Sequence, residues 1–320
     1  MTLRSERLCV DSTPYYHLMS RCVRKAFLCG KDPNTGKDFD YRREWIEERL
    51  FGLAHIFAVD LHAYAVMSNH LHLVVRVDKE RAEGWSDQEV IRRYGKLFRF
   101  KAREVASLPA RERKERVAQW RERLWSLSWL MRCLNEFIAR RANAEEDLKG
   151  RFWEGRFTCQ PLLDEAALLT CMAYVDLNPV RAGMAKSLER SKHTSIAKRI
   201  RQLDSAMDSD APPGPVGLTP FADQVPSRSR RTVVPMHYVD YLELLQWTGR
   251  SLRARGGTLK HPPQLLAELK LNPNAFLAMM KTHGLRTNSV LGSLDLVHAF
   301  ATTHGKHWVQ GKGEAQSLFR

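Results

Sequence analysis

The chain has 320 residues, 43% of them hydrophobic, with a net charge of +15 at pH 7 and an isoelectric point near 9.8. This length favours two domains with apolar cores, and the positive charge indicates a polyanionic partner, nucleic acid before an acidic membrane surface. The sequence has no apolar run near the ~18 residues of a membrane span, no signal-peptide core at its start and no CxxC pair, so we expect a cytoplasmic protein with reduced cysteines.

The first part of the chain predicts a strand, a helix and a hairpin. Residues 15–23, YYHLMSRCV, alternate weakly and predict a strand. Ile46, Leu50, Leu53 and Phe57 are spaced as one face of an amphipathic helix. Residues 60–67 and 69–77 then predict two strands joined by a tight turn at Ser68-Asn69.

The second strand of this hairpin, NHLHLVVRV, carries two histidines in an apolar run. Side chains alternate faces along a strand, so His70 and His72 share one face while Leu71 and Leu73 share the other. Two imidazoles at this spacing can bind one metal ion. The alternative is a pair of ordinary polar histidines on an open sheet face.

The middle of the chain is helical and highly charged. Residues 86–145 have helical periodicity and many arginines, so they form either a solvated helix pair or a surface for phosphates. Residues 151–163 predict a loop and a fourth strand. A helix follows, with Asp164 as its N-cap and Pro179 limiting its far end. The order β-α-β-β-α-β-α predicts an α+β fold with a ferredoxin-like antiparallel sheet.

The last third is divided by a segment of different composition. Residues 205–231 are rich in Pro, Ser and Asp without periodicity, which predicts a linker. Four short helical patterns follow, so residues 232–320 predict a small all-α domain of unknown role.

Tyr174 and Asn178 are one helical turn apart and project from the same side of the predicted helix. A phenol is a nucleophile, and an amide oxygen is a hard metal ligand. Each residue also has an ordinary explanation: Tyr174 as a core aromatic and Asn178 as a residue of the helix end before Pro179. Set against His70 and His72 in a basic chain, the four side chains together indicate a site.

These segments resemble a known family. SNHLHLVV resembles the His-hydrophobic-His motif of the HUH endonuclease superfamily, and YVDLNPVRAG is similar to the catalytic-helix signature of its single-tyrosine branch, above all the REP-associated tyrosine transposases. YYHLMSRCVRKAFL and GRFWEGRF also resemble family segments, so the resemblance covers about residues 10–200. Residues 1–204 would then be the HUH domain, with a charged insertion near 86–128 that is longer than the family leads us to expect.

The resemblance implies an activity and roles for four residues. It implies metal-dependent cleavage and strand transfer of single-stranded DNA at hairpin or repeat sequences through a covalent 5′-phosphotyrosine. Tyr174 would be the nucleophile; His70, His72 and Asn178 would bind Mg²⁺ or Mn²⁺. Further expectations are a cytoplasmic, nucleoid-associated protein with no membrane partner, acting as a monomer or homodimer.

Basic and aromatic residues near this region are candidates for contacts with DNA. Seven cations follow the nucleophile, which favours a phosphate track over a merely solvated tail. The candidate DNA-binding residues are Arg151, Trp153, Arg156, Arg181, Lys186, Arg190, Lys192, Lys198, Arg199 and Arg201.

Two other functions stay open at this stage. A domesticated, non-catalytic nucleic-acid-binding protein could use the same fold, although the four intact site residues favour an enzyme. A zinc hydrolase built on the HxH pair would need a third strong ligand and a base, and the sequence has no HExxH or similar motif.

Overall fold

The centre of the molecule is one four-stranded sheet. The computed structural model describes residues 10–23, 27–32, 35–98, 102–207, 217–226, 232–253, 261–281, 289–307 and 309–319. The strands are β1 (Tyr15–Arg21), β2 (Val59–Val66), β3 (His70–Val77) and β4 (Thr158–Leu162), in the order β2-β3-β1-β4. Each neighbouring pair is antiparallel, so the predicted α+β class and the four predicted strands are confirmed.

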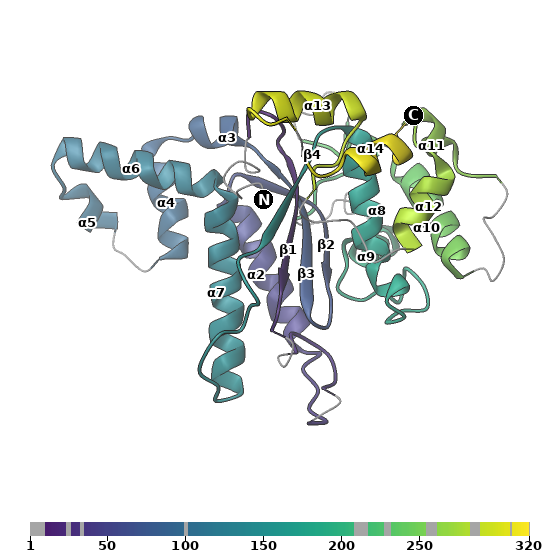
Figure 1. The fold of residues 1–320 in the computed structure, drawn as a ribbon. Coiled ribbons are helices and arrows are strands. Elements are labelled where there is room, and N and C mark those ends of the chain that lie inside the picture. The colour runs from purple at the N-terminus through teal and green to yellow at the C-terminus, as the bar shows by residue number, and fades with distance from the viewer. Residues whose placement is uncertain are drawn as a thin grey trace.

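One face of the sheet is apolar and is covered by α2 (Arg42–Ile56) and α7 (Leu127–Glu145) (Figure 1). Leu71 and Leu73 on β3 pack in one core with Ile46 and Leu50 of α2. The predicted helical face of residues 46–57 is therefore confirmed, with Phe57 as the first residue after the helix.

The opposite face lies under α8 (Glu165–Arg181). Ala63 and Ala65 on β2 are small enough to let this helix approach the sheet closely. Every residue from 166 to 179 is buried, so α8 has almost no solvent-exposed side. Its N-cap is Asp164, whose carboxylate accepts a hydrogen bond from the backbone N–H of Ala167 at 2.7 Å, as the sequence predicts.

Pro179 does not limit α8, which is a correction to the sequence prediction. The helix continues to Arg181, with Pro179 in its last turn. A proline there removes only one intrahelical hydrogen bond, and its carbonyl accepts from Met184 and Ala185 beyond the helix. Asn178 and Arg181 consequently belong to the same helix as Tyr174.

Helix α3 (Lys79–Glu83) follows β3, and the charged insertion then forms α4 (Asp87–Leu97), α5 (Ala102–Ala106) and α6 (Ala110–Trp125). In Figure 1 these helices project to the side of the sheet away from α10. Tyr94 stacks on Trp120 with ring centroids 4.5 Å apart, which gives the insertion an apolar anchor of its own. Ion pairs such as Arg111–Glu115, at 2.9 Å, cover its outer surface.

The part of the chain from residue 195 onward packs on α8. It contains α9 (Ser195–Met207), η1 (Ala222–Gln224), α10 (Tyr238–Arg253), α11 (Gln264–Glu268), α12 (Pro273–Lys281), α13 (Leu294–Thr303) and α14 (Lys312–Leu318). The four helices predicted after residue 232 are present as α10 to α13. Tyr241 and Phe276 share a core with Leu168 of α8, and Figure 1 shows α10 and α12 beside that helix.

The segment predicted as a linker is partly packed. Residues 208–216 and 227–231 lie outside the described residues. Residues 217–226 are described: the N–H of Thr219 donates to the carbonyl of Leu61 on β2 at 2.8 Å, and Phe221 is buried. The division of the chain at 205–231 into two domains stays a prediction.

Two expectations from composition concern described residues only. Cys22, Cys29, Cys133, Cys159 and Cys171 are buried free thiols. Across the described residues, every helix is too short or too polar to cross a membrane.

Candidate functional site

The two histidines of β3 lie on the face under α8. His72 is 2% exposed, whereas His70, at the first position of the strand, is half-buried. Their ring centroids are 4.7 Å apart and the rings are nearly perpendicular, at 87°. His70 Nδ1 faces the side-chain oxygen of Asn69 at 2.7 Å and donates to it, which leaves His70 Nε2 as a lone-pair nitrogen.

Helix α8 brings Tyr174 and Asn178 onto this pair. The ring centroids of Tyr174 and His72 are 5.8 Å apart, and Asn178 Nδ2 lies 3.2 Å from His72 Nε2. The i, i+4 spacing puts both side chains on the surface of α8 that faces the sheet. The four residues singled out by the sequence thus share one location, while their chemical roles stay predictions.

Arg181, one turn further along α8, joins Tyr174 to Asn178. One guanidinium nitrogen donates to the Tyr174 hydroxyl at 3.0 Å and to Asn178 Oδ1 at 3.2 Å. The guanidinium carbon also lies 5.0 Å from the centroid of the Tyr174 ring. Sequence analysis made Arg181 a contact for DNA; the structure places it against the candidate nucleophile.

Burial governs the ionisation of the site. It raises the pKa of Tyr174, and the charge of Arg181 opposes that rise. Burial, together with the nearby charges of Arg21 and Arg181, lowers the pKa of His70 to about 4. Burial likewise holds the pKa of His72 well below its ordinary value. Both imidazoles are therefore neutral at pH 7, the form that binds metals.

Two buried residues of the site were missed by sequence analysis. His17 on β1 brings its Nε2 to 2.9 Å from His72 Nδ1, and its own Nδ1 lies 3.2 Å from Gln160 Oε1 on β4. A histidine inside the alternating apolar pattern of the first strand was the available signal. Strand order could not be deduced from that pattern, and only the order places β1 between β3 and β4.

The segment 151–156 borders the same end of the sheet. The N–H of Glu154 donates to the carbonyl of Arg21, and Arg21 is the register partner of His70. Arg151 and Arg156 are exposed there, as is Arg21, which sequence analysis did not select. Trp153 is half-buried, with its indole N–H donating to the carbonyl of Asn135 at 2.9 Å.

The basic segment after α8 is not uniform. The exposed cations are Lys186, Arg190, Lys192 and Arg201. Lys198 is half-buried, with its ammonium 4.6 Å from the Phe51 ring centroid. Arg199 is only 2% exposed and donates to the carbonyls of His62 and Thr219. Its inclusion in a phosphate track was therefore wrong, because its charge is used inside the protein.

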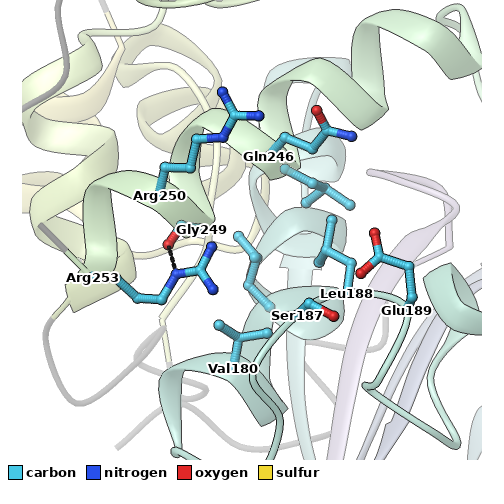
Figure 2. A pocket seen from close by; sticks show the side chains of 10 residues that line it. Val180, Ser187, Leu188, Glu189, Gln246, Gly249, Arg250 and Arg253 are labelled. Atoms are coloured by element: carbon cyan, nitrogen blue, oxygen red, sulfur yellow. Dashed lines mark hydrogen bonds between the residues drawn. The ribbon is translucent and has the colours of Figure 1, made fainter.

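A pocket of about 200 Å³ lies between the end of α8 and α10 (Figure 2). Leu177 and Val180 of α8 line it together with Gln246 and Arg250 of α10. Arg253 donates to the carbonyl of Lys186 at 2.6 Å, which ties the basic segment to α10.

No protein-family model matches the sequence, and no curated protein matches it. One solved structure, described as "Structure of the REP associates tyrosine transposase bound to a REP hairpin", aligns with 69% of this chain and 93% of its own. Its sequence identity is 12% and its TM-score is 0.36.

Proposed function

We propose that this chain is a metal-dependent single-stranded DNA endonuclease and strand transferase, transposase-like, that forms a covalent 5′-phosphotyrosine at hairpin or repeat sequences. One observation carries the proposal: α8 holds Tyr174, Asn178 and Arg181 against the two imidazoles of β3. A nucleophilic hydroxyl, two lone-pair nitrogens and a fixed cation in one place suit phosphoryl transfer.

In the proposed reaction the Tyr174 oxygen attacks the scissile phosphorus. The bond from phosphorus to the 3′ oxygen breaks, the phenol loses its proton, and the departing oxygen gains one to become a 3′ hydroxyl. Arg181, 3.0 Å from the phenol oxygen, stabilises negative charge on that oxygen. One phosphodiester replaces another, so a new 3′ hydroxyl can reverse the step without an external energy source.

The two imidazoles suit a divalent cation, whereas the Asn178 amide does not in its present orientation. His70 Nε2 and His72 Nε2 would be its nitrogen ligands, because Nδ1 of each ring donates to a neighbour and leaves the lone pair on Nε2; at His72 that lone pair now accepts from the Asn178 amide nitrogen. Asn178 turns its amide nitrogen to His72 and its oxygen to Arg181, so the amide must rotate for its oxygen to bind metal. Mg²⁺ or Mn²⁺, when bound, would neutralise the scissile phosphate and the leaving oxygen. Among the described residues, this site included, no group of three or more His, Cys, Asp or Glu is placed to hold a metal, so the Asn178 oxygen would have to be the third protein ligand.

The sheet supports the family resemblance of the motifs. Its strands and main helices follow the order β-α-β-β-α-β, and its antiparallel strand order is β4-β1-β3-β2. We infer a ferredoxin-like domain of the HUH type, in which α8 follows the fourth strand and carries the nucleophile.

The alternative of a non-catalytic nucleic-acid-binding protein has specific support. Tyr174 is 5% exposed, and Asn178 presents nitrogen to His72. Both features would suit a site that no longer reacts. Formation of a covalent protein–DNA adduct distinguishes the endonuclease from the non-catalytic binding protein.

The test uses the full chain and single-stranded hairpin DNA labelled separately at its two ends. With Mn²⁺ added, we expect a protein–DNA adduct on a denaturing gel. The adduct should carry the 3′-end label, while the 5′-labelled fragment ends in a free hydroxyl. Binding without any adduct would support the non-catalytic alternative, and an adduct carrying the 5′-end label would overturn the mechanism.

A further inference from the structure

His72 belongs to a continuous row of hydrogen-bonded side chains across the face of the sheet. Beginning at α8, the row runs through Arg181, Asn178, His72, His17, Gln160 and Ser289. Between Asn178 and Ser289 every member is at most 2% exposed. Since water cannot satisfy these groups, the order of donors and acceptors within the row is constrained.

Arg181 sets the direction of the row. A guanidinium can only donate, so the Asn178 atom that faces Arg181 is its oxygen. The amide nitrogen of Asn178 then donates to His72 Nε2, which must be the unprotonated nitrogen of a neutral ring. His72 therefore carries its hydrogen on Nδ1.

The same elimination extends to the other strands. His72 Nδ1–H donates to His17 Nε2 at 2.9 Å, so His17 carries its hydrogen on Nδ1. That hydrogen is donated to Gln160 Oε1 at 3.2 Å, and the Gln160 amide nitrogen donates to the Ser289 hydroxyl at 3.0 Å. Every link has one donor and one acceptor, so the row is consistent from end to end.

Ring geometry supports a directed N–H···N bond between the two histidines. Their planes differ by 19° and their centroids are 5.1 Å apart. With the two nitrogens 2.9 Å apart, that separation is near the largest possible. The rings consequently lie edge to edge in nearly one plane, the arrangement that aligns an N–H with a lone pair.

We propose that His17 and Gln160 are positioning residues, which hold His72 in the Nδ1–H tautomer and keep its Nε2 lone pair directed at Tyr174 and Asn178. The inference rests on the proposed function, in which His72 Nε2 is a metal ligand. Outer partners of this kind fix the tautomer and orientation of metal-binding histidines, and their loss typically costs 10–100-fold in metal affinity. Ser289 is a member of the row, so the C-terminal region also contributes to it.

Two readouts test the proposal without DNA cleavage. Long-range proton–nitrogen NMR correlations of the metal-free protein should show His72 as the Nδ1–H tautomer. Calorimetric titration with Mn²⁺ alone should show a 10–100-fold weaker affinity in His17→Phe, which keeps a ring but removes the acceptor. His17→Gln supplies an amide oxygen as acceptor and should recover most of that loss.

The controls separate positioning from mere burial. His62 is an equally buried histidine on β2, outside the row, so His62→Phe should bind Mn²⁺ like the wild type. If His17→Phe fails to fold, Gln160→Leu breaks the row one step away and should also disturb the His72 tautomer. An Nε2–H tautomer of His72 in the wild type, or unchanged tautomer and affinity in the His17 and Gln160 variants, overturns the proposal. A wild type without Mn²⁺ affinity refutes the metal chemistry, while the NMR spectra still decide the positioning role.

Discussion

At the scale of single residues, Tyr174 is set in two opposing environments. Burial disfavours its phenolate, whereas Arg181 donates to its hydroxyl and favours it. A buried phenol beside a fixed cation is protected from other reactions and needs only a bound phosphate to complete its surroundings.

Tyr174→Phe should abolish the covalent adduct and leave binding of single-stranded DNA unchanged, because only the attacking oxygen is lost. The matched control is Tyr94→Phe, since the Tyr94 hydroxyl also accepts from an arginine, Arg123, at 2.7 Å, but within the insertion. Adduct yield on denaturing gels checks both variants. Residual adduct in Tyr174→Phe would mean that another nucleophile acts.

His70→Ala and His72→Ala should each abolish metal-dependent cleavage and largely preserve DNA binding. The two variants should differ in how much they destabilise the folded protein. His72→Ala leaves buried partners on both sides unpaired and should cost about 1–3 kcal/mol, whereas the half-buried His70 should cost less. Asn178→Ala should lose only part of the cleavage, because water can replace one oxygen ligand. Urea unfolding and cleavage assays measure these effects, and equal loss of binding and cleavage in all three would indicate a structural role.

At the scale of elements, α8 is held from two sides. The sheet covers one side, and α9 and α10 reach it through Asp176, a fully buried carboxylate. Asp176 accepts from the Ser195 hydroxyl at 2.5 Å and from the Tyr241 hydroxyl at 2.6 Å. The carboxylate thus links α8, which carries the proposed nucleophile, to the C-terminal region.

Tyr241→Phe should destabilise the protein by about 1.5–3 kcal/mol, because it removes a buried hydrogen bond to a charged group. Tyr41→Phe makes the same chemical change at an exposed hydroxyl that donates to Glu145, and its effect should be near zero. Chemical denaturation compares the two. Similar losses would show that burial does not set the strength of the Asp176 bond.

The placement of α8 shows how far pattern reasoning extends. Period two put His70 and His72 on one face, and the four-residue spacing put Tyr174 and Asn178 on one side of a helix. Their contact required knowing which face α8 covers, which the family resemblance supplied. His17 and Gln160 were missed because their relation to His72 exists only through strand pairing between distant segments. Because Arg199 is charged, we expected it at the surface. The carbonyls of His62 and Thr219 that accept its hydrogen bonds are brought together only by the fold.

At the scale of the whole molecule, the exposed cations after α8 should govern binding to single-stranded DNA. Replacing Lys186, Arg190 and Lys192 by alanine removes three exposed charges. Each phosphate contact adds ~0.7 to the steepness of the fall of log K with log salt on single strands. If each of the three residues contacts one phosphate, the variant should bind with a slope that is shallower by ~2. The control replaces Arg111, Arg113 and Arg116 of the insertion. A slope that falls only in that control would move the phosphate contacts to the insertion.

Buried neutral histidines should make the protein sensitive to acid. Burial lowers the pKa of His62 from 6.5 to about 4, so between these values the unfolded chain binds a proton that the folded protein does not. Stability therefore falls as pH drops through this window, by up to ~1.4 kcal/mol per pH unit for this group. Asp176, whose pKa is raised by burial, acts in the opposite sense. Urea unfolding at several pH values should give a shallower dependence in His62→Phe, and an unchanged dependence would refute this assignment.

Under the proposed function, the enclosure of α8 also determines which partner would move during strand transfer. Residues 166–179 have no solvent-exposed side, and bonds to the sheet and to α10 hold the helix in place. Under the proposed function we therefore expect Tyr174 to serve the histidines of its own chain, beside which it lies. The protein site would stay in place during strand exchange. The DNA ends would then have to enter and leave that one site, one after the other. Each polypeptide would handle one junction at a time, and the departure of the first 3′ end would limit the arrival of the next.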